Sequence, residues 1–344
     1  MTTNKKLIWS LISLLLAALT ISTVLSQLGE MPLQQLGESL READKRYLAA
    51  AAVCGALFIL LEGEAVRCIL RGAGYPRGFG SGLVYSASDI YFSAVTPSAT
   101  GGQPASALFM IRDGIPAGVV TATLIVNLVM YTFSIVLLGL GAAATSFRLL
   151  YGFRLLSKLL IGVGFTILTG LTVFFFALLG KGDAVFGALG SLAKLLHRLK
   201  LLHRLDHALA RLDHAQRDYD ECAALMKGKT ATLVKAFFLN FLQRSAQIAV
   251  PMFTYLALGG SPALAPKVFA SQCFVTIGYN CVPVPGAMGV ADYLMVDGFT
   301  DLMQREEALH LEMLSRSISF YICVAVSGVI VLLGYLRQRN RKRR

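Results

Sequence analysis

Residues 96–104 read TPSATGGQP and break an apolar segment, residues 83–110, near its middle. A second apolar segment, residues 268–299, is broken in the same way by VPVPGAMG at residues 282–289. Proline removes a backbone donor and glycine loosens a helix, so each break exposes peptide groups that hydrocarbon cannot satisfy. Such backbone persists at membrane depth only inside protein or beside a wet cavity. We therefore expect two re-entrant helical hairpins whose tips meet near the middle of a bilayer.

Composition places the whole chain in a membrane. Of its 344 residues, 55% are hydrophobic and 15% are charged, whereas an average soluble domain has about 25% charged residues. A mean hydropathy of +0.62 leaves too little polar surface for a soluble globular domain. Apolar runs suited to spanning a bilayer fall at residues 7–25, 47–61, 115–144, 156–180, 232–258 and 317–336. The sequence therefore predicts an all-α, polytopic membrane protein.

The charged segments suggest an orientation. The basic tail, residues 337–344, directly follows the last apolar run, which marks the cytoplasmic side and contact with anionic lipid. This juxtamembrane position argues against nucleic-acid binding by the tail. With Lys5 and both termini in the cytoplasm, the acidic residues 30–44 lie outside, and basic residues 148–158 are the exception to the rule. We expect the cytoplasmic membrane of a bacterium, with the first hairpin entering from the cytoplasm and the second from outside.

The order of segments suggests an internal repeat. Residues 1–144 and 156–336 each contain span, span, hairpin and span, in opposite orientations. Broken segments at corresponding positions of inverted halves are typical of a transport site. We predict one membrane domain, residues 1–344, with two inverted repeats of about three spanning helices and one hairpin each. Residues 181–231 hold leucines at spacings of three or four among basic residues, which predicts an amphipathic cytoplasmic helix or a docking segment.

Ionisable residues inside these segments are candidates for the site. Each costs roughly 2.5 to 3.5 kcal/mol on insertion, so each indicates a cavity or a partner. Guanidinium groups bind phosphate through two parallel hydrogen bonds, and helix starts after Gly102 and Gly286 add backbone donors. Arg244 is the strongest candidate because Asn240, Gln243 and Gln247 make its helix polar in mid-span.

Together these arguments predict a binding site for an anionic phospholipid. Its predicted residues are Arg67, Asp89, Gly101, Gly102, Gln103, Arg112, Asn127, Arg244, Pro285, Gly286, Asp292 and Arg316. The alternatives are that Arg112 pairs with Asp113 and that Arg67 and Arg316 extend to the membrane interface.

Metal binding and catalysis find no support in the sequence motifs. The six cysteines include no CxxC pair, and His203 and His207 stand four apart without a well-placed third ligand. No Walker loop, nucleophile elbow or HExxH pattern occurs. We expect no metal, no cofactor and no catalytic residue.

Both breaks also resemble known signatures. PSATGGQPASALFMIRDG at residues 97–114 resembles P-x-x-x-G-G-(E/Q)-P…R-x-G of the lysylphosphatidylglycerol synthase transmembrane, or flippase-like, family. PVPGAMGVAD at residues 283–292 is similar to the family's P-x-P-G-G-x-G-x-x-E, and Arg316 stands where the family places an arginine in its last helix. Ala287 departs from the pattern by replacing a glycine, and Asp292 by replacing a glutamate.

The resemblance carries implications for function. The best-known member, the multiple peptide resistance factor, joins such a membrane region to a cytosolic domain that transfers lysine from lysyl-tRNA to phosphatidylglycerol. By resemblance, this chain keeps the lipid-handling region and lacks the transferase, which implies translocation of a lysyl-phosphatidylglycerol-like lipid. The alternatives are a membrane subunit that docks a separately encoded lipid-modifying transferase, and a structural or regulatory membrane protein.

Overall fold

The computed structural model describes residues 41–96, 100–198, 227–282 and 284–341, with a few positions between 209 and 224. These residues form helices and turns, with no strand among them. The predicted first span, residues 7–25, and part of the predicted amphipathic segment, residues 181–231, lie outside the described residues. The predicted all-α class is confirmed.

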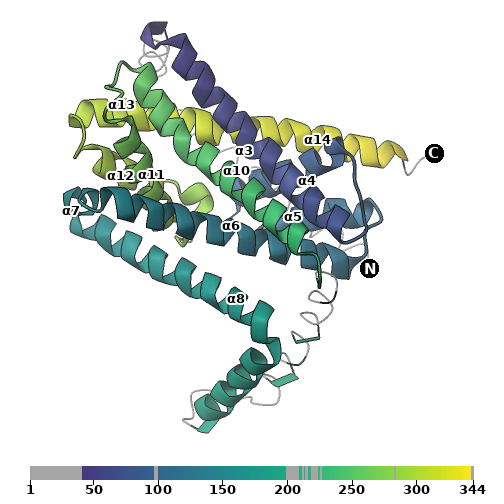
Figure 1. Ribbon diagram of the computed structural model, residues 1–344. Helices are drawn as coiled ribbons and strands as arrows, with labels where there is room; N and C mark the ends of the chain where they lie inside the picture. The colour runs from purple at the N-terminus through teal and green to yellow at the C-terminus, as the bar shows by residue number, and fades with distance from the viewer. Residues whose placement is uncertain are drawn as a thin grey trace, which may run out of the picture.

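Figure 1 shows the helices as one bundle with a long helix, α8, along its side. In chain order they are α3 (Lys45–Gly72), α4 (Phe79–Val95), α5 (Gly102–Arg112), α6 (Ala117–Ser146), α7 (Leu149–Gly152), α8 (Leu155–Arg198), α10 (Thr230–Ala257), α11 (Ala265–Asn280), the 3-10 turn η2 (Pro285–Ala287), α12 (Val290–Phe299), α13 (Arg305–Arg316), the π-helix η3 (Ser317–Ile322) and α14 (Cys323–Arg341).

Four segments in the described part are long and apolar enough to cross a membrane: Lys45–Gly72, Ala117–Ser146, Leu155–Ala177 and Arg305–Arg339. The chain is therefore a polytopic membrane protein. The predicted span at 232–258 forms α10 but is not among the four, because polar residues interrupt its apolar sequence in mid-helix. The last span begins at Arg305 rather than at residue 317, since α13, η3 and α14 follow one another without a loop.

Helices α3 and α10 form an antiparallel pair through the centre of the bundle (Figure 1). At one end, the Asp44 backbone N–H donates to the Ala257 carbonyl at 2.8 Å. At the other end, Gly72 faces the Thr232 side chain so closely that a Cβ would overlap it. Close approach along this pair brings the polar middle of α10 against the middle of α3.

Both predicted hairpins form. Helices α4 and α5 run antiparallel, because Gly102 lies against Asp89 near the tip while the Tyr85 hydroxyl donates to Asp113 at 2.6 Å near the base. Helices α11 and α12 do the same, since the Ser271 hydroxyl donates to the Gly298 carbonyl at 2.9 Å near their base. None of these four helices is among the four candidate spans, and their re-entry from the membrane surface stays a prediction.

The two hairpins enter the bundle from opposite ends. The base of the first is tied to the end of α14, where Gln338 Nε2 donates to Asp113 Oδ1 at 2.9 Å. The base of the second is tied to the start of α8, where the Arg154 backbone N–H donates to Asp297 Oδ2 at 2.9 Å. Helix α4 packs on α14, and α11 packs on α6, so each hairpin contacts the last long helix of the other half. The inverted-repeat relation between the halves stays a prediction.

Candidate functional site

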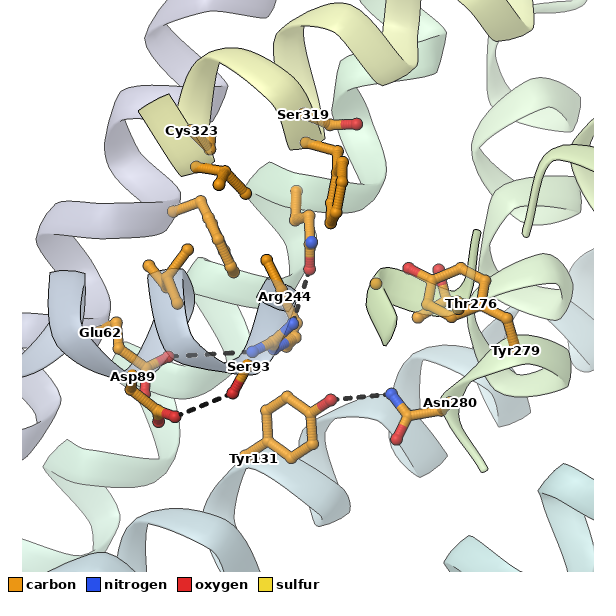
Figure 2. Close-up of a pocket in the computed structure, with 18 of the residues that line it drawn as sticks. Glu62, Asp89, Ser93, Tyr131, Arg244, Thr276, Tyr279, Asn280, Ser319 and Cys323 are labelled. Atoms are coloured by element: carbon orange, nitrogen blue, oxygen red, sulfur yellow. Dashed lines mark hydrogen bonds and ion pairs between the residues drawn. The ribbon is translucent and has the colours of Figure 1, made fainter. Parts of the chain in front are cut away.

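The tips of the two hairpins meet at a cavity of about 700 Å³. The first break contributes Thr100, Gln103 and Pro104, and the second contributes Val282, Val284 and Gly286 to its wall. Helices α3, α6, α10, α13 and η3 complete it, with the polar side chains arranged around the hollow in Figure 2. Both proline- and glycine-rich breaks therefore contribute to the wall of one partly polar cavity.

Glu62, in the middle of α3, is the buried carboxylate of this cavity and is 5% exposed. It accepts hydrogen bonds from Asn127 Nδ2 on α6 at 3.0 Å and from Gln243 Nε2 on α10. Asn240 Nδ2 in turn donates to Asn127 Oδ1 at 3.0 Å. This chain of amides satisfies the carboxylate and links three helices through one buried polar network.

Arg244 extends from α10 into the cavity wall beside Glu62. Its Nη2 lies 3.8 Å from Glu62 Oε2, and its Nη1 donates to Gln247 Oε1 at 2.6 Å. The guanidinium carbon lies 3.9 Å from the Tyr131 ring centre and 5.1 Å from that of Phe58. The planar cation is thus stacked on aromatic faces, which hold its orientation without using its hydrogen-bond donors.

Asp89 brings a second carboxylate to the same wall from α4. Its Oδ1 accepts a hydrogen bond from the Ser93 hydroxyl at 3.1 Å, and it interacts electrostatically with both Glu62 and Arg244. The three charged groups and Ser93 lie together in Figure 2. On this side of the cavity, two carboxylates therefore share one guanidinium group.

Arg316, at the end of α13, holds the second break. Its Nε lies 2.7 Å from Asp292 Oδ1, its Nη2 donates to the Gly286 carbonyl at 3.5 Å, and its Cζ lies 4.6 Å from the Phe320 ring centre. Asp292 also accepts from the Gly289 backbone N–H at 2.8 Å and so caps α12. The ion pair fixes the second hairpin tip against the last long helix.

Glu312 lies before the last span predicted from the sequence, residues 317–336, but its side chain is buried. It is 9% exposed and hydrogen bonds with Asp292 beside Arg316. The reason is that helix α13 starts at Arg305, so one face of residues 305–316 turns inward and takes Glu312 with it.

The backbone of each break has a specific steric requirement. At the second break Gly286, Ala287 and Gly289 have φ values of 58°, 51° and 74°. Ala287 is the non-glycine residue with a positive φ in the described part, a conformation that costs an L-residue about 1–2 kcal/mol. At the first break a Cβ on Gly102 would overlap Asp89 Oδ1 and the Ser93 hydroxyl, so only glycine lets α5 start this close to α4.

The structure brings half of the predicted site residues to the cavity wall: Asp89, Gln103, Asn127, Arg244, Gly286 and Arg316. Asp292 stands behind Arg316, Gly101 and Gly102 shape the first turn, and Pro285 begins η2. Arg67 and Arg112 lie outside the cavity wall. Arg67 pairs with Glu64 and donates to the Arg77 carbonyl, while Arg112 stacks 5.7 Å from the Tyr335 ring centre.

Sequence reasoning missed Glu62. The predicted span, residues 47–61, stops one residue before Glu62, so the prediction leaves Glu62 outside the span. The helix continues to Gly72 through the buried Val66, Ile69 and Leu70, which places Glu62 well inside it. The sequence does contain a signal for a longer helix, because apolar residues continue for more than a turn after this carboxylate.

The described residues include no group of three or more His, Cys, Asp or Glu side chains arranged to hold a metal ion. The cavity offers instead guanidinium, amide, hydroxyl and carboxylate groups, which bind through charge and hydrogen bonds.

Comparison with known proteins identifies a family for this chain. The family model described as "Lysylphosphatidylglycerol synthase TM region" matches residues 10–327. A relative described as a UPF0104 membrane protein, from Pyrococcus horikoshii, is 21% identical over 338 residues, which cover 95% of this chain and 97% of the relative. No solved structure matches the chain.

Proposed function

This chain belongs to the lysylphosphatidylglycerol synthase transmembrane-region family, and we propose that it moves a phosphate-bearing lipid between the two leaflets of its membrane. The head group crosses through the cavity between the hairpin tips, while the acyl chains stay in the bilayer. The ligand is a phosphate-bearing lipid: an anionic phospholipid such as phosphatidylglycerol, or a lysyl-phosphatidylglycerol-like lipid, which carries the same phosphate together with ammonium groups. The proposed membrane is the cytoplasmic membrane of a bacterium, with both termini in the cytoplasm.

One observation carries this proposal: two arginines from different helices line a single cavity at the junction of two broken segments. Tyr279, on the second hairpin, lines the same cavity as Arg244 and Arg316. Phosphodiesters are bound well by such planar cations. A cavity with polar groups on its wall also explains why proline and glycine are tolerated at this depth.

Arg244 has the capacity to bind a ligand. It lines the cavity, and its contact with Glu62 is 3.8 Å long, which is longer than a direct hydrogen bond. Arg316, in contrast, is held at 2.7 Å by Asp292. We therefore assign first contact with the phosphate to Arg244 and a second contact, made after exchange of an ion pair, to Arg316.

The opposite entry of the hairpins supplies a route. The base of the first hairpin is tied to the α14 end of the bundle, and the base of the second is tied to the end where α8 begins. Movement of one hairpin at a time would open the cavity to each side in turn, as in transporters built around broken helices.

Reconstitution tests this function directly. The full chain is placed in phosphatidylcholine vesicles with a trace of fluorescent phosphatidylglycerol, and a membrane-impermeant reductant bleaches the outer leaflet. The proposal predicts that bleaching continues beyond the outer-leaflet fraction, for phosphatidylglycerol but not for a neutral glycolipid. Bleaching that stops at the outer leaflet for every phospholipid class contradicts the proposal.

A second candidate follows from the family's description, which names the membrane region of a synthase. In that case the chain is the membrane subunit of a lysylphosphatidylglycerol synthase or another lipid-modifying enzyme and presents lipid to a separate transferase. Co-purification distinguishes the two: a partner held through residues 192–212 is lost when Leu199 and Leu205 are both changed to Glu, whereas intrinsic translocation survives that change.

A further inference from the structure

The charges on the first-hairpin side of the cavity do not balance. Glu62 and Asp89 are both carboxylates, and Arg244 is the cation with which both of them interact. The proposed function adds a phosphodiester to this group. An anion placed beside two carboxylates and one guanidinium is opposed by Coulomb repulsion at low dielectric unless a positive charge enters with it.

The two carboxylates differ in their hydrogen-bond partners. Donors from Asn127 and Gln243 converge on the two oxygens of Glu62, and Arg244 faces the same side chain. The protein itself therefore supplies the partners of Glu62. Asp89 accepts from the Ser93 hydroxyl at 3.1 Å and has no ion pair of its own within 4 Å among the described residues.

A buried acceptor on the cavity wall points independently to a ligand that carries hydrogen-bond donors. Gln272 lines the cavity from α11 and is 6% exposed, and its Oε1 has no hydrogen-bond partner among the described residues. A buried acceptor of this kind is costly unless a donor reaches it. The hydroxyls of a glycerol-type head group would supply that donor.

We infer that Asp89 is a proton-binding site whose protonation accompanies the entry of an anionic head group at Arg244. This inference rests on the proposed function. The proton passes from water on the side to which the cavity is open to a carboxylate oxygen of Asp89, and it leaves with the lipid on the other side. One proton bound for each phosphodiester leaves the net charge of the cavity unchanged.

The surroundings of Asp89 limit which other groups take part. From α3 it faces Glu62 and from α10 Arg244, while α5 and η2 present no ionisable side chain to the cavity. The remaining titratable or charged groups on the cavity wall are Tyr131 of α6, Tyr279 of α11, Cys281 after it, Arg316 of α13 with its partners Asp292 and Glu312, and Cys323 of α14. On the second-hairpin side Arg316 also faces two carboxylates, Asp292 and Glu312, but neither of them lines the cavity, whereas Asp89 does so on the same wall as Arg244.

Proton uptake on ligand binding tests the inference without transport. The full chain, in detergent and weak buffer, is titrated with sn-glycero-3-phosphoglycerol while binding and pH are followed together. Wild type is expected to take up about one proton per bound molecule, so its affinity falls up to about tenfold per pH unit as pH rises through the linked range. Asp89→Asn is expected to bind with almost no uptake and a flat pH dependence, and Glu306→Gln, an exposed carboxylate, to behave as wild type.

Binding by wild type with no proton uptake overturns the inference and leaves the proposed function intact. Absence of any binding by wild type overturns the phosphate assignment on which it rests. In vesicles, an acid-outside gradient is expected to drive net accumulation of fluorescent phosphatidylglycerol in the inner leaflet. Asp89→Glu should keep this accumulation, and Asp89→Asn should exchange lipid without accumulating it. Accumulation that persists in Asp89→Asn contradicts the inference even where exchange is confirmed.

Discussion

Arg244 Nη2 and Glu62 Oε2 lie 3.8 Å apart across the contact between α10 and α3, at the polar centre of the bundle. Both side chains are largely buried, with 11% and 7% of their side-chain surface exposed. Helices α3 and α10 belong to the two halves of the chain, so this pair joins the halves at the cavity wall. Its loss is expected to affect stability and ligand binding together.

A double-mutant cycle measures the coupling of this pair. Glu62→Ala leaves Arg244 buried without its ion-pair partner, a change that costs about 3–5 kcal/mol in buried pairs. We expect Glu62→Ala and Arg244→Ala each to lower the thermal unfolding temperature in detergent, and the double variant to lose less than their sum. Strict additivity of the two effects would show that the residues do not interact.

The first hairpin tip depends on Gly102. Gly102→Ala places a Cβ on Asp89 Oδ1 and the Ser93 hydroxyl, and overpacking of this kind costs about 1–3 kcal/mol. The matched control is Gly170→Ala on α8, where a Cβ meets nothing within 4 Å and the helix gains propensity. We expect Gly102→Ala to lower the thermal unfolding temperature and Gly170→Ala to raise it. Equal effects of the two substitutions would contradict the packing of α5 on α4.

The second hairpin tip depends on a carboxylate at position 292. Asp292→Ala removes the partner of Arg316 and the cap of α12, with an expected loss of about 3 kcal/mol or more in unfolding free energy. Asp292→Glu restores the acidic residue of the family signature and should retain most of the stability. Glu306→Ala, on the exposed face of α13, is the control. If it lowered the unfolding free energy as much as Asp292→Ala does, Asp292 would not be a specific support of the second hairpin tip.

The positive φ of Ala287 predicts that glycine at this position stabilises the folded protein. Because its φ is 51°, Ala287→Gly relieves about 1–2 kcal/mol of backbone strain, partly offset by the greater freedom of glycine in the unfolded chain. We expect a small rise in unfolding temperature. Ala56→Gly, at an exposed position within α3, should instead lose about 1 kcal/mol. A fall of similar size for Ala287→Gly would contradict the left-handed turn.

The hairpins were predictable because proline and glycine report local backbone chemistry. TPSATGGQP and VPVPGAMG cannot continue a helix, and apolar flanks require that the chain turn back within the bundle. Arg244 was predictable for a related reason, since three polar neighbours on one helix cannot all face lipid.

Other features depend on where helices begin and end, which local sequence fixes poorly. Arg112 lies in the last turn of α5 and Arg67 lies between one and two turns before the end of α3, both outside the cavity wall, although a guanidinium in mid-span and one near a helix end look alike in sequence. Glu62 and Glu312 are buried because α3 continues to Gly72 and α13 begins at Arg305. Their partners come from distant helices, and no local pattern specifies such contacts.

The most direct test of the cavity is a comparison of arginines in the phosphatidylglycerol translocation assay. Arg244→Ala removes a cavity cation, whereas Arg112→Ala removes one that stacks on Tyr335 outside the cavity. Loss of a charged hydrogen bond of about 1.5–3 kcal/mol corresponds to about a tenfold to hundredfold slower translocation. We expect this loss for Arg244→Ala and near wild-type rates for Arg112→Ala, with both variants folded by size-exclusion chromatography. Equal rates for wild type and Arg244→Ala would contradict a head-group path between the hairpin tips.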